Sequence, residues 1–205
     1  MVAVIDYDAG NIKSVEKAIQ FLGGEVIVTR DPEEILKASH VILPGVGSFG
    51  DAIRKLEEYN LIPVIHEVAA RKIPFLGICL GLQLLFESSE ESPGIKGLGL
   101  LKGKIKRIPE ENQLKIPHIG WNALSYPKSG RLYQGIKEHS YVYFVHSYYL
   151  EAEEDIVTAA TEYGTYIHAS VEKENIFACQ FHPEKSSDVG LKILKNFLEV
   201  KKEEL

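Results

Sequence analysis

One cysteine in this sequence lies in a pattern that can activate it as a nucleophile. Cys79 is the third residue of the pentapeptide 77–81, Gly-Ile-Cys-Leu-Gly, which joins an apolar run to a segment with helical spacing. This is the G-x-nucleophile-x-G pattern of a sharp strand-to-helix turn, with cysteine in place of serine. A sulfur at the start of a helix meets unpaired N–H groups and the positive end of the helix dipole, which favour the thiolate. The alternative is an unreactive core residue, because free cysteine is among the residue types most often buried.

A histidine and a glutamate near the C-terminus are the groups that such a nucleophile needs. His182 and Glu184 lie on either side of Pro183, after an apolar run. Side chains two residues apart in an extended segment point to the same face, and proline favours extended backbone in the residue before it. Glu184 would then orient His182, which would take the proton from the sulfur. The alternative is an ordinary ion pair of His182 and Glu184 at the surface. Because the same chain contains the pentapeptide around Cys79, a site of Cys79, His182 and Glu184 is favoured.

A second loop, 44–47, has the sequence Pro-Gly-Val-Gly and also follows an apolar run. Together with the backbone N–H of Leu80, it can offer two donors to an oxyanion that forms during attack on a carbonyl. The alternative for this loop is a plain tight turn.

The elements that must position these groups alternate between strand and helix over the first hundred residues. Apolar runs at 2–5, 25–29, 40–43 and 75–79 predict strands, and helical spacing follows each of them, over 80–87 after the last run. Asp31, Pro32 and Glu34 predict a helix start with a reciprocal capping box. The acidic segment 88–99 is interpreted as a surface loop, and 103–180 as short strands before a last helix from Ser186 or Ser187. This order predicts one domain, 1–205, with a three-layer α/β fold, a mostly parallel central sheet and an added antiparallel portion.

Composition excludes several classes of function. The 205 residues have a net charge of −6 and no long basic run, which argues against nucleic-acid binding. No apolar stretch approaches the ~20 residues of a membrane span, and the first residues predict a strand and not a secretory signal. The two cysteines predict neither a disulfide framework nor a cysteine-rich zinc site, so we expect a reduced, cytoplasmic protein. Segment 97–103 fails as a dinucleotide fingerprint, a Walker A pattern is missing, and we expect no cofactor and no metal.

Several motifs together resemble those of the class I (triad) glutamine amidotransferases. The resemblance rests on 77–83, Gly-Ile-Cys-Leu-Gly-Leu-Gln, and on 181–184, Phe-His-Pro-Glu. Three further segments, 44–50, 117–122 and 143–148, are similar to those of glutaminase subunits of imidazole glycerol phosphate synthase, from histidine biosynthesis. The resemblance runs from the first strand to the last helix, and it implies the flavodoxin-like class I glutaminase fold.

The resemblance implies hydrolysis of glutamine to glutamate and ammonia. Cys79 would form a thioester with the substrate, His182 would transfer protons, and Glu184 would orient His182. Val46 and Leu80 would offer backbone N–H groups to the oxyanion. The residues that the resemblance assigns to glutamine binding are Gly47, Gln83, His146, Ser147 and Tyr148.

The expected partner is a cyclase subunit. Free ammonia is protonated in neutral water, so a useful glutaminase should pass it directly to a second active site. The resemblance implies a heterodimer with the cyclase, a (β/α)₈ barrel that forms imidazole glycerol phosphate and aminoimidazole carboxamide ribotide. Segments 8–11 and 117–122 are the predicted contact surface. The alternatives are a glutaminase that serves another synthase, a stand-alone Cys/His hydrolase of amide or γ-glutamyl bonds, and a non-catalytic subunit.

Overall fold

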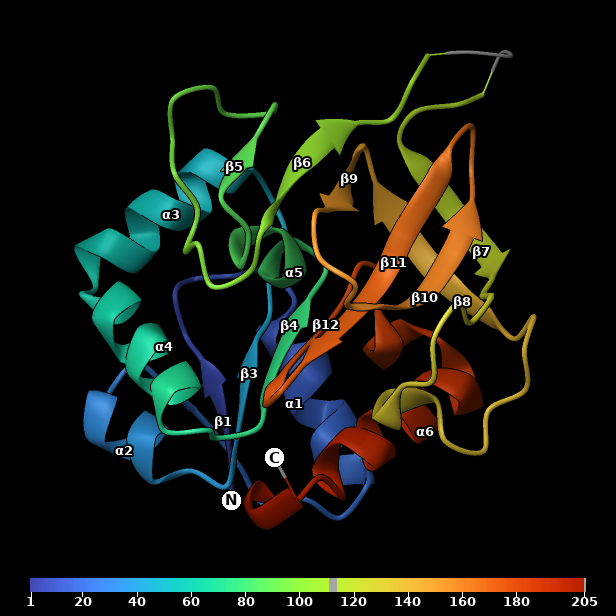
Figure 1. Ribbon diagram of the computed structural model, residues 1–205. Coiled ribbons are helices and arrows are strands. Elements are labelled where there is room, and N and C mark those ends of the chain that lie inside the picture. Colours follow the sequence, from blue (N-terminus) through green and yellow to red (C-terminus); the bar gives the residue numbers. More distant parts are fainter. Residues whose placement is uncertain (111–113, 205) are drawn as a thin grey trace.

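The centre of the molecule is a seven-stranded sheet, with helices on both faces (Figure 1). The structure, a computed structural model, describes residues 1–110 and 114–204. The strands occur in the order β10-β11-β12-β4-β3-β1-β2. The five from β12 to β2 are parallel, and β10 and β11 are antiparallel to their neighbours. These strands are β1 (Val2–Ile5), β2 (Val26–Thr29), β3 (His40–Leu43), β4 (Phe75–Ile78), β10 (Val157–Glu162), β11 (Tyr166–Lys173) and β12 (Ile176–Cys179).

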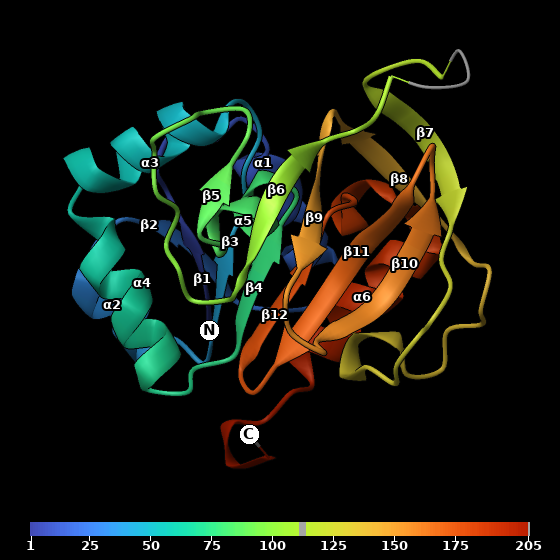
Figure 2. The same ribbon diagram turned by 45° about the horizontal axis from the view of Figure 1, so that its top comes forward.

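Two smaller sheets stand beside the C-terminal half of the large sheet (Figure 2). One contains β5 (Ser88–Ser89), β6 (Gly103–Arg107) and β9 (Tyr148–Ala152). The other is an antiparallel pair, β7 (His118–Ala123) with β8 (Tyr141–His146). The prediction of a mostly parallel sheet with an added antiparallel portion is therefore confirmed.

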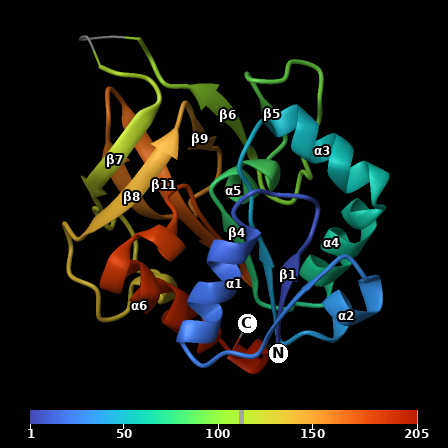
Figure 3. The ribbon, with the colours of Figure 1, turned by 180° about the vertical axis from the view of Figure 1, so that it is seen from behind.

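The helices divide between the two faces of the large sheet. One face is covered by α2 (Pro32–Lys37), α3 (Phe49–Glu58), α4 (Leu61–Ala70) and the short α5 (Leu80–Leu84). The other is covered by α1 (Ile12–Phe21) and α6 (Ser187–Leu198), which lie in front of the sheet when it is seen from behind (Figure 3). Single turns of 3₁₀ helix occur at Arg131–Tyr133, Pro183–Lys185 and Lys202–Glu204. Among the described residues, no helix is long and apolar enough to cross a membrane.

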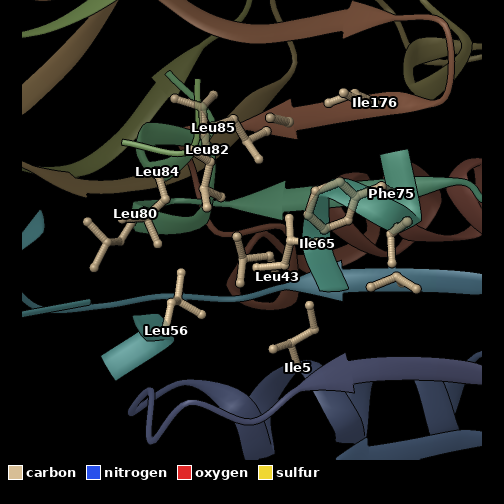
Figure 4. Packing of buried hydrophobic residues seen from close by; sticks show 14 of the residues in the cluster. Ile5, Leu43, Leu56, Ile65, Phe75, Leu80, Leu82, Leu84, Leu85 and Ile176 are labelled. Carbon is tan, nitrogen blue, oxygen red and sulfur yellow. The ribbon is translucent and has the colours of Figure 1, made fainter. Parts of the chain in front are cut away.

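The strands bury side chains on both faces because alternate residues point to opposite sides. In β1, Ala3 and Ile5 face the core under α2 to α5, and Val2 and Val4 face the core under α1 and α6. Figure 4 shows the first of these cores, in which Ile5, Leu43 and Phe75 of three neighbouring strands lie near Leu56 and Ile65 of the helices. The strands β1, β3, β4 and β12 are buried along their whole length, which explains why their sequences are continuous apolar runs.

The register of the central strands brings three strand ends to one edge. Leu43 of β3 pairs with Gly77 of β4, and Ile78 of β4 pairs with Cys179 of β12. The segments that begin at Pro44, Cys79 and Gln180 therefore leave the sheet side by side. This edge is the one where ligand sites form in open α/β sheets.

Three local predictions were wrong, and the first is the reciprocal capping box at Asp31. The side chain of Asp31 caps α2 through the backbone N–H groups of Glu33 and Glu34, but Glu34 does not complete a reciprocal box, because its carboxylate accepts from the Thr29 hydroxyl. The Asp31 N–H donates to the same hydroxyl oxygen at 3.0 Å.

Helix α5 ends at Leu84 and not at the predicted Glu87. The carbonyl of Leu84 accepts from the Leu98 N–H at 2.8 Å, and that of Leu85 accepts from the Leu100 N–H at 2.9 Å. Both carbonyls are therefore used by the returning chain and not by a further helical turn. The segment 88–99 is thus more than a surface loop, since it contains β5 and packs Leu98 into the core.

Candidate active site

Cys79 occupies a sharp turn between β4 and α5. It is the residue before the helix, with φ 55° and ψ −109°, a strained backbone conformation for a residue with a side chain. Two neighbouring glycines allow the turn: a Cβ at Gly77 would lie 2.7 Å from the carbonyl oxygen of Gly81, and a Cβ at Gly81 would overlap the carbonyl oxygen of Leu43. The Cys79 N–H donates to the Cys179 carbonyl at 2.8 Å, which ties the turn to β12. The predicted elbow is present.

His182 and Glu184 form a buried pair next to this turn. Nδ1 of His182 lies 2.8 Å from Oε1 of Glu184, and neither side chain is exposed to solvent. The predicted pairing is confirmed, but its expected backbone was wrong: only His182 is extended, and Pro183–Lys185 form a 3₁₀ turn. Proline suits the first position of such a turn, because its fixed φ is already helical. The amide of Asn11 donates to the same Glu184 oxygen at 3.2 Å.

The surroundings of His182 favour its charged form. Burial lowers its pKa, but the attraction of the Cys79 sulfur and of the hydrogen-bonded Glu184 carboxylate outweighs burial and raises the pKa to about 10. Its Nε2 is buried and, among the described residues, has no conventional hydrogen-bond partner. The imidazole is thus held at Nδ1 and free at Nε2 to exchange a proton at the sulfur. The second cysteine, Cys179, is fully buried, and burial raises the pKa of its thiol, as expected for an inert residue.

The sulfur and the imidazole line one cavity of about 300 Å³. Nine of the ten residues predicted for the site line it: Val46, Gly47, Cys79, Leu80, Gln83, His146, Ser147, Tyr148 and His182. The tenth, Glu184, lies behind His182. The cavity also has walls that the sequence analysis did not assign, from Glu91, Pro117 and Val145.

The predicted oxyanion donors are not both available in this structure. The Leu80 N–H donates to the carbonyl of Gly45 at 3.3 Å, so it is occupied by the neighbouring loop. In that loop Val46 is partly exposed and Gly47 has φ 105°, a conformation that suits glycine. The 45–47 backbone must turn before Leu80 can donate to an oxyanion.

Two buried histidines support the wall of the cavity opposite the elbow. Nδ1 of His146 lies 2.9 Å from the Tyr148 carbonyl, and its Nε2 lies 3.1 Å from Nδ1 of His118. The carbonyl can only accept, so His146 carries its proton on Nδ1, and its Nε2 accepts a hydrogen bond from the Nδ1–H of His118. Burial lowers the pKa of His118 to about 4 and that of His146 to about 3. Both rings are therefore neutral, and the turn through Ser147 is held without adding positive charge near His182.

Glu91 is a cavity residue that the sequence analysis missed, because it lies in the acidic segment interpreted as a surface loop. Its carboxylate accepts from the Phe49 N–H at 2.8 Å, which fixes it at the cavity wall. A fixed carboxylate suits the α-ammonium group of an amino acid. Gln83 lies nearby, and its amide nitrogen is already used by the Tyr148 carbonyl and by Gln180, so its oxygen is the atom left for a ligand.

Comparison with known proteins agrees with this geometry. Residues 3–200 match the model of the family described as glutamine amidotransferase class-I. The chain is 52% identical over 200 residues to the imidazole glycerol phosphate synthase subunit HisH of Moorella thermoacetica, with 97% of this chain and 94% of that protein covered. It is 48% identical to the protein of the same name from Methanocaldococcus jannaschii, with 98% and 100% covered.

Solved structures show the same fold at lower identity. A crystal structure titled as a glutamine amidotransferase superposes with a TM-score of 0.76 at 19% identity, covering 97% of this chain and 98% of that one. The structure of PurLQS from Thermotoga maritima gives a TM-score of 0.73 at 20% identity, with 96% of each chain covered.

Proposed function

The chain belongs to the class I glutamine amidotransferase family, and we propose that Cys79, His182 and Glu184 are the residues that perform its chemistry. Its function is that of the glutaminase subunit of imidazole glycerol phosphate synthase in histidine biosynthesis. The roles of individual residues rest on the cavity that joins the Cys79 elbow to the His182–Glu184 pair. Residues 1–205 act as one domain in this proposal.

The proposed reaction has two halves. The Cys79 thiolate attacks the side-chain amide carbon of glutamine, and the carbonyl electrons move to oxygen, where the N–H groups of Val46 and Leu80 stabilise them. The imidazolium of His182 protonates the leaving nitrogen, the C–N bond breaks, and ammonia departs. Neutral His182 then takes a proton from water, which attacks the thioester; the C–S bond breaks, and glutamate is released. Glu184 keeps His182 in one orientation throughout.

Glutamine fits the cavity with its amide toward Cys79 and its charged end toward the opposite wall. In this proposal Glu91 accepts from the α-ammonium group, and the oxygen of Gln83 accepts a further N–H. Gly47 and the turn through His146, Ser147 and Tyr148 enclose the rest of the substrate. The chemistry of these residues requires no cofactor.

The relatives' names describe a synthase subunit, and we propose that a cyclase is the partner of this chain. We propose a heterodimer with a barrel-shaped cyclase, in contact with the β7–β8 hairpin and the loop 8–11. Ile119 and Trp121 of β7 are 59% and 50% exposed, and Tyr141 of β8 is 58% exposed. These apolar side chains belong to the same hairpin region as Pro117, which lines the cavity. An exposed aromatic cluster beside a cavity is typical of an interface centre.

The loop 8–11 connects this proposed interface to the catalytic pair. Asn11 donates to Glu184, and a Cβ on Gly10 would lie 3.1 Å from the Val46 side chain. We propose that the cyclase turns the 45–47 backbone and frees the Leu80 N–H. The cytoplasm is the proposed location, because a catalytic thiol must stay reduced.

The experiment that tests this function uses Cys79→Ala in complex with a cyclase and its nucleotide ligand. We expect glutamine-dependent synthesis to be lost and synthesis from added ammonium to continue. Retained glutamine hydrolysis would refute the role of Cys79. Equal hydrolysis rates for the isolated and the partnered parent protein would refute activation by the cyclase.

The interface is tested separately by Trp121→Ala, which should weaken complex formation. Phe21→Ala is the matched control, because Phe21 is 77% exposed on α1, outside the proposed interface. Equal affinity of both variants for the cyclase would place the interface elsewhere.

A further inference from the structure

A second amide, outside the proposed triad, lies against the reactive sulfur. Gln180 follows β12 directly and is completely buried. Its backbone N–H donates to the Ala169 carbonyl at 2.8 Å, which fixes its position at the strand end. Its side-chain Nε2 lies 3.7 Å from Sγ of Cys79, within the range of an N–H donor to sulfur. The apolar pattern around Gln180 predicts only the end of a strand at this position.

The orientation of the Gln180 amide is set by a chain of hydrogen bonds. The Tyr148 carbonyl can only accept, so the Gln83 atom 3.1 Å away is its amide nitrogen. The same nitrogen lies 3.0 Å from Gln180, which therefore presents its oxygen to Gln83. The nitrogen of Gln180 must then point to the sulfur. A flipped Gln180 amide would place N–H against N–H at one end and oxygen against the sulfur at the other.

We propose that Gln180 is a catalytic residue that donates a hydrogen bond to the Cys79 thiolate, an inference that rests on the proposed function of Cys79. The imidazolium of His182 is the ionic partner of the anionic sulfur, and the neutral amide of Gln180, directly after β12, is its hydrogen-bond donor. Burial makes such a donor valuable, because an anion removed from water is costly unless it is hydrogen-bonded. Gln83 acts as the positioning residue that keeps the donor end of Gln180 on the sulfur.

This donor acts where the sulfur carries charge. When the C–S bond forms, the sulfur becomes neutral and the hydrogen bond weakens. When water attacks the thioester, the C–S bond breaks, its electron pair returns to sulfur, and the hydrogen bond is restored. Gln180 therefore stabilises the thiolate both before acylation and as the leaving group of deacylation.

The test is the pH dependence of Cys79 alkylation by iodoacetamide in the complex with a cyclase, followed by the mass of the peptide that contains Cys79. Gln180→Met keeps a long side chain without a donor. In this variant we expect the profile of alkylation rate against pH to shift toward alkaline pH by about one pH unit. The fully ionised sulfur should then react about threefold faster than in the parent, because nucleophilicity rises as the thiolate becomes more basic. The two profiles should cross, an effect that simple loss of stability does not produce.

Two further variants keep the test decisive. Gln180→Glu retains an acceptor for Gln83 but removes the donor and adds a like charge, so its profile should move at least as far toward alkaline pH as that of Gln180→Met. It also reports the effect if Gln180→Met fails to fold. Asn196→Leu is the matched control, because Asn196 is a buried amide that donates to Leu132 and Gln134 at 2.9 Å, away from the cavity. Its profile should not move.

Unmoved profiles in both Gln180 variants would overturn this inference. That result is distinguishable from failure of the proposed function, which would appear as glutamine hydrolysis by Cys79→Ala. Synthesis from added ammonium, measured for every variant, reports whether the complex is assembled.

Discussion

The buried pair of His182 and Glu184 makes the effect of Glu184→Gln calculable. The two side chains are fully buried with 2.8 Å between Nδ1 and Oε1. Opposite unit charges centred about 4 Å apart attract by about 4 kcal/mol at the effective permittivity of protein sites. Glutamine keeps the shape and can accept one hydrogen bond, but it loses this attraction to the imidazolium, which in the proposed mechanism protonates the leaving nitrogen. We expect kcat/KM for glutamine to fall about a thousandfold.

The assay compares glutamate release by the parent and variant complexes under saturating nucleotide ligand. Synthesis from added ammonium should be retained, because it bypasses this site. Since Glu184 is one of the groups that raise the pKa of His182, the alkaline limb of the rate profile should also move to lower pH. Glu172→Gln is the matched control, because it breaks a largely buried ion pair with Arg131, 2.7 Å long and outside the cavity. A Glu184→Gln rate near that of the parent would remove Glu184 from the mechanism.

Three further predictions concern the turn, the histidine pair and pH. Gly81→Ala should lower the free energy of unfolding by about 3 kcal/mol and Tm by about 6–12 °C, because its Cβ overlaps the Leu43 carbonyl. Gly94→Ala should lose less, because its Cβ meets open space and only the positive φ of 85° opposes it; equal losses would contradict the steric argument. His118→Leu should raise KM for glutamine about tenfold with little change in kcat, because it leaves the buried Nε2 of His146 without its hydrogen-bond donor. An unchanged KM would contradict this role of His118. The free energy of unfolding should fall as the pH rises from 6.5 to 10. The pKa of His182 is higher in the folded protein than in the unfolded chain, so its positive charge stabilises the fold fully below pH 6.5 and no longer above about pH 10. Denaturant titrations at each pH should show a smaller fall in the free energy of unfolding for Cys79→Ala than for the parent. An equal fall in both proteins would mean that the sulfur does not stabilise the charged form of His182.

The sequence was sufficient to predict the parallel core, because its strands are buried on both faces and its helices have one apolar face. The cysteine elbow was also predictable, since only glycine fits at 77 and 81. The pattern of an apolar run followed by helical spacing predicts these elements from a few neighbouring residues.

Long-range hydrogen bonding was not predictable in the same way. The helix α5 ends early because residues 98–101 return to take its last carbonyls, and Glu34 bonds to Thr29 and not to its own cap. Glu91 was missed because an acidic loop residue looks the same whether it faces solvent or a cavity. Gln180 was missed because one polar residue at the end of an apolar strand does not show what it faces.

The position of β12 explains how residues far apart in the chain form one site. After α5 the chain leaves the sheet, contributes Glu91, Pro117 and residues 145–148 to the cavity wall, and returns through β10 and β11 to place β12 beside β4. The proposed nucleophile and base thus follow two neighbouring parallel strands, β4 and β12, whereas the cavity wall from Pro117 and 145–148 comes from the inserted antiparallel part. Because Cys179 pairs with Ile78, a slip of one residue between β12 and β4 would turn Gln180 away from the sulfur and shift His182 by about 3.3 Å along the strand. Sheet register, more than the flexibility of the loops, therefore determines whether the sulfur and its partners meet.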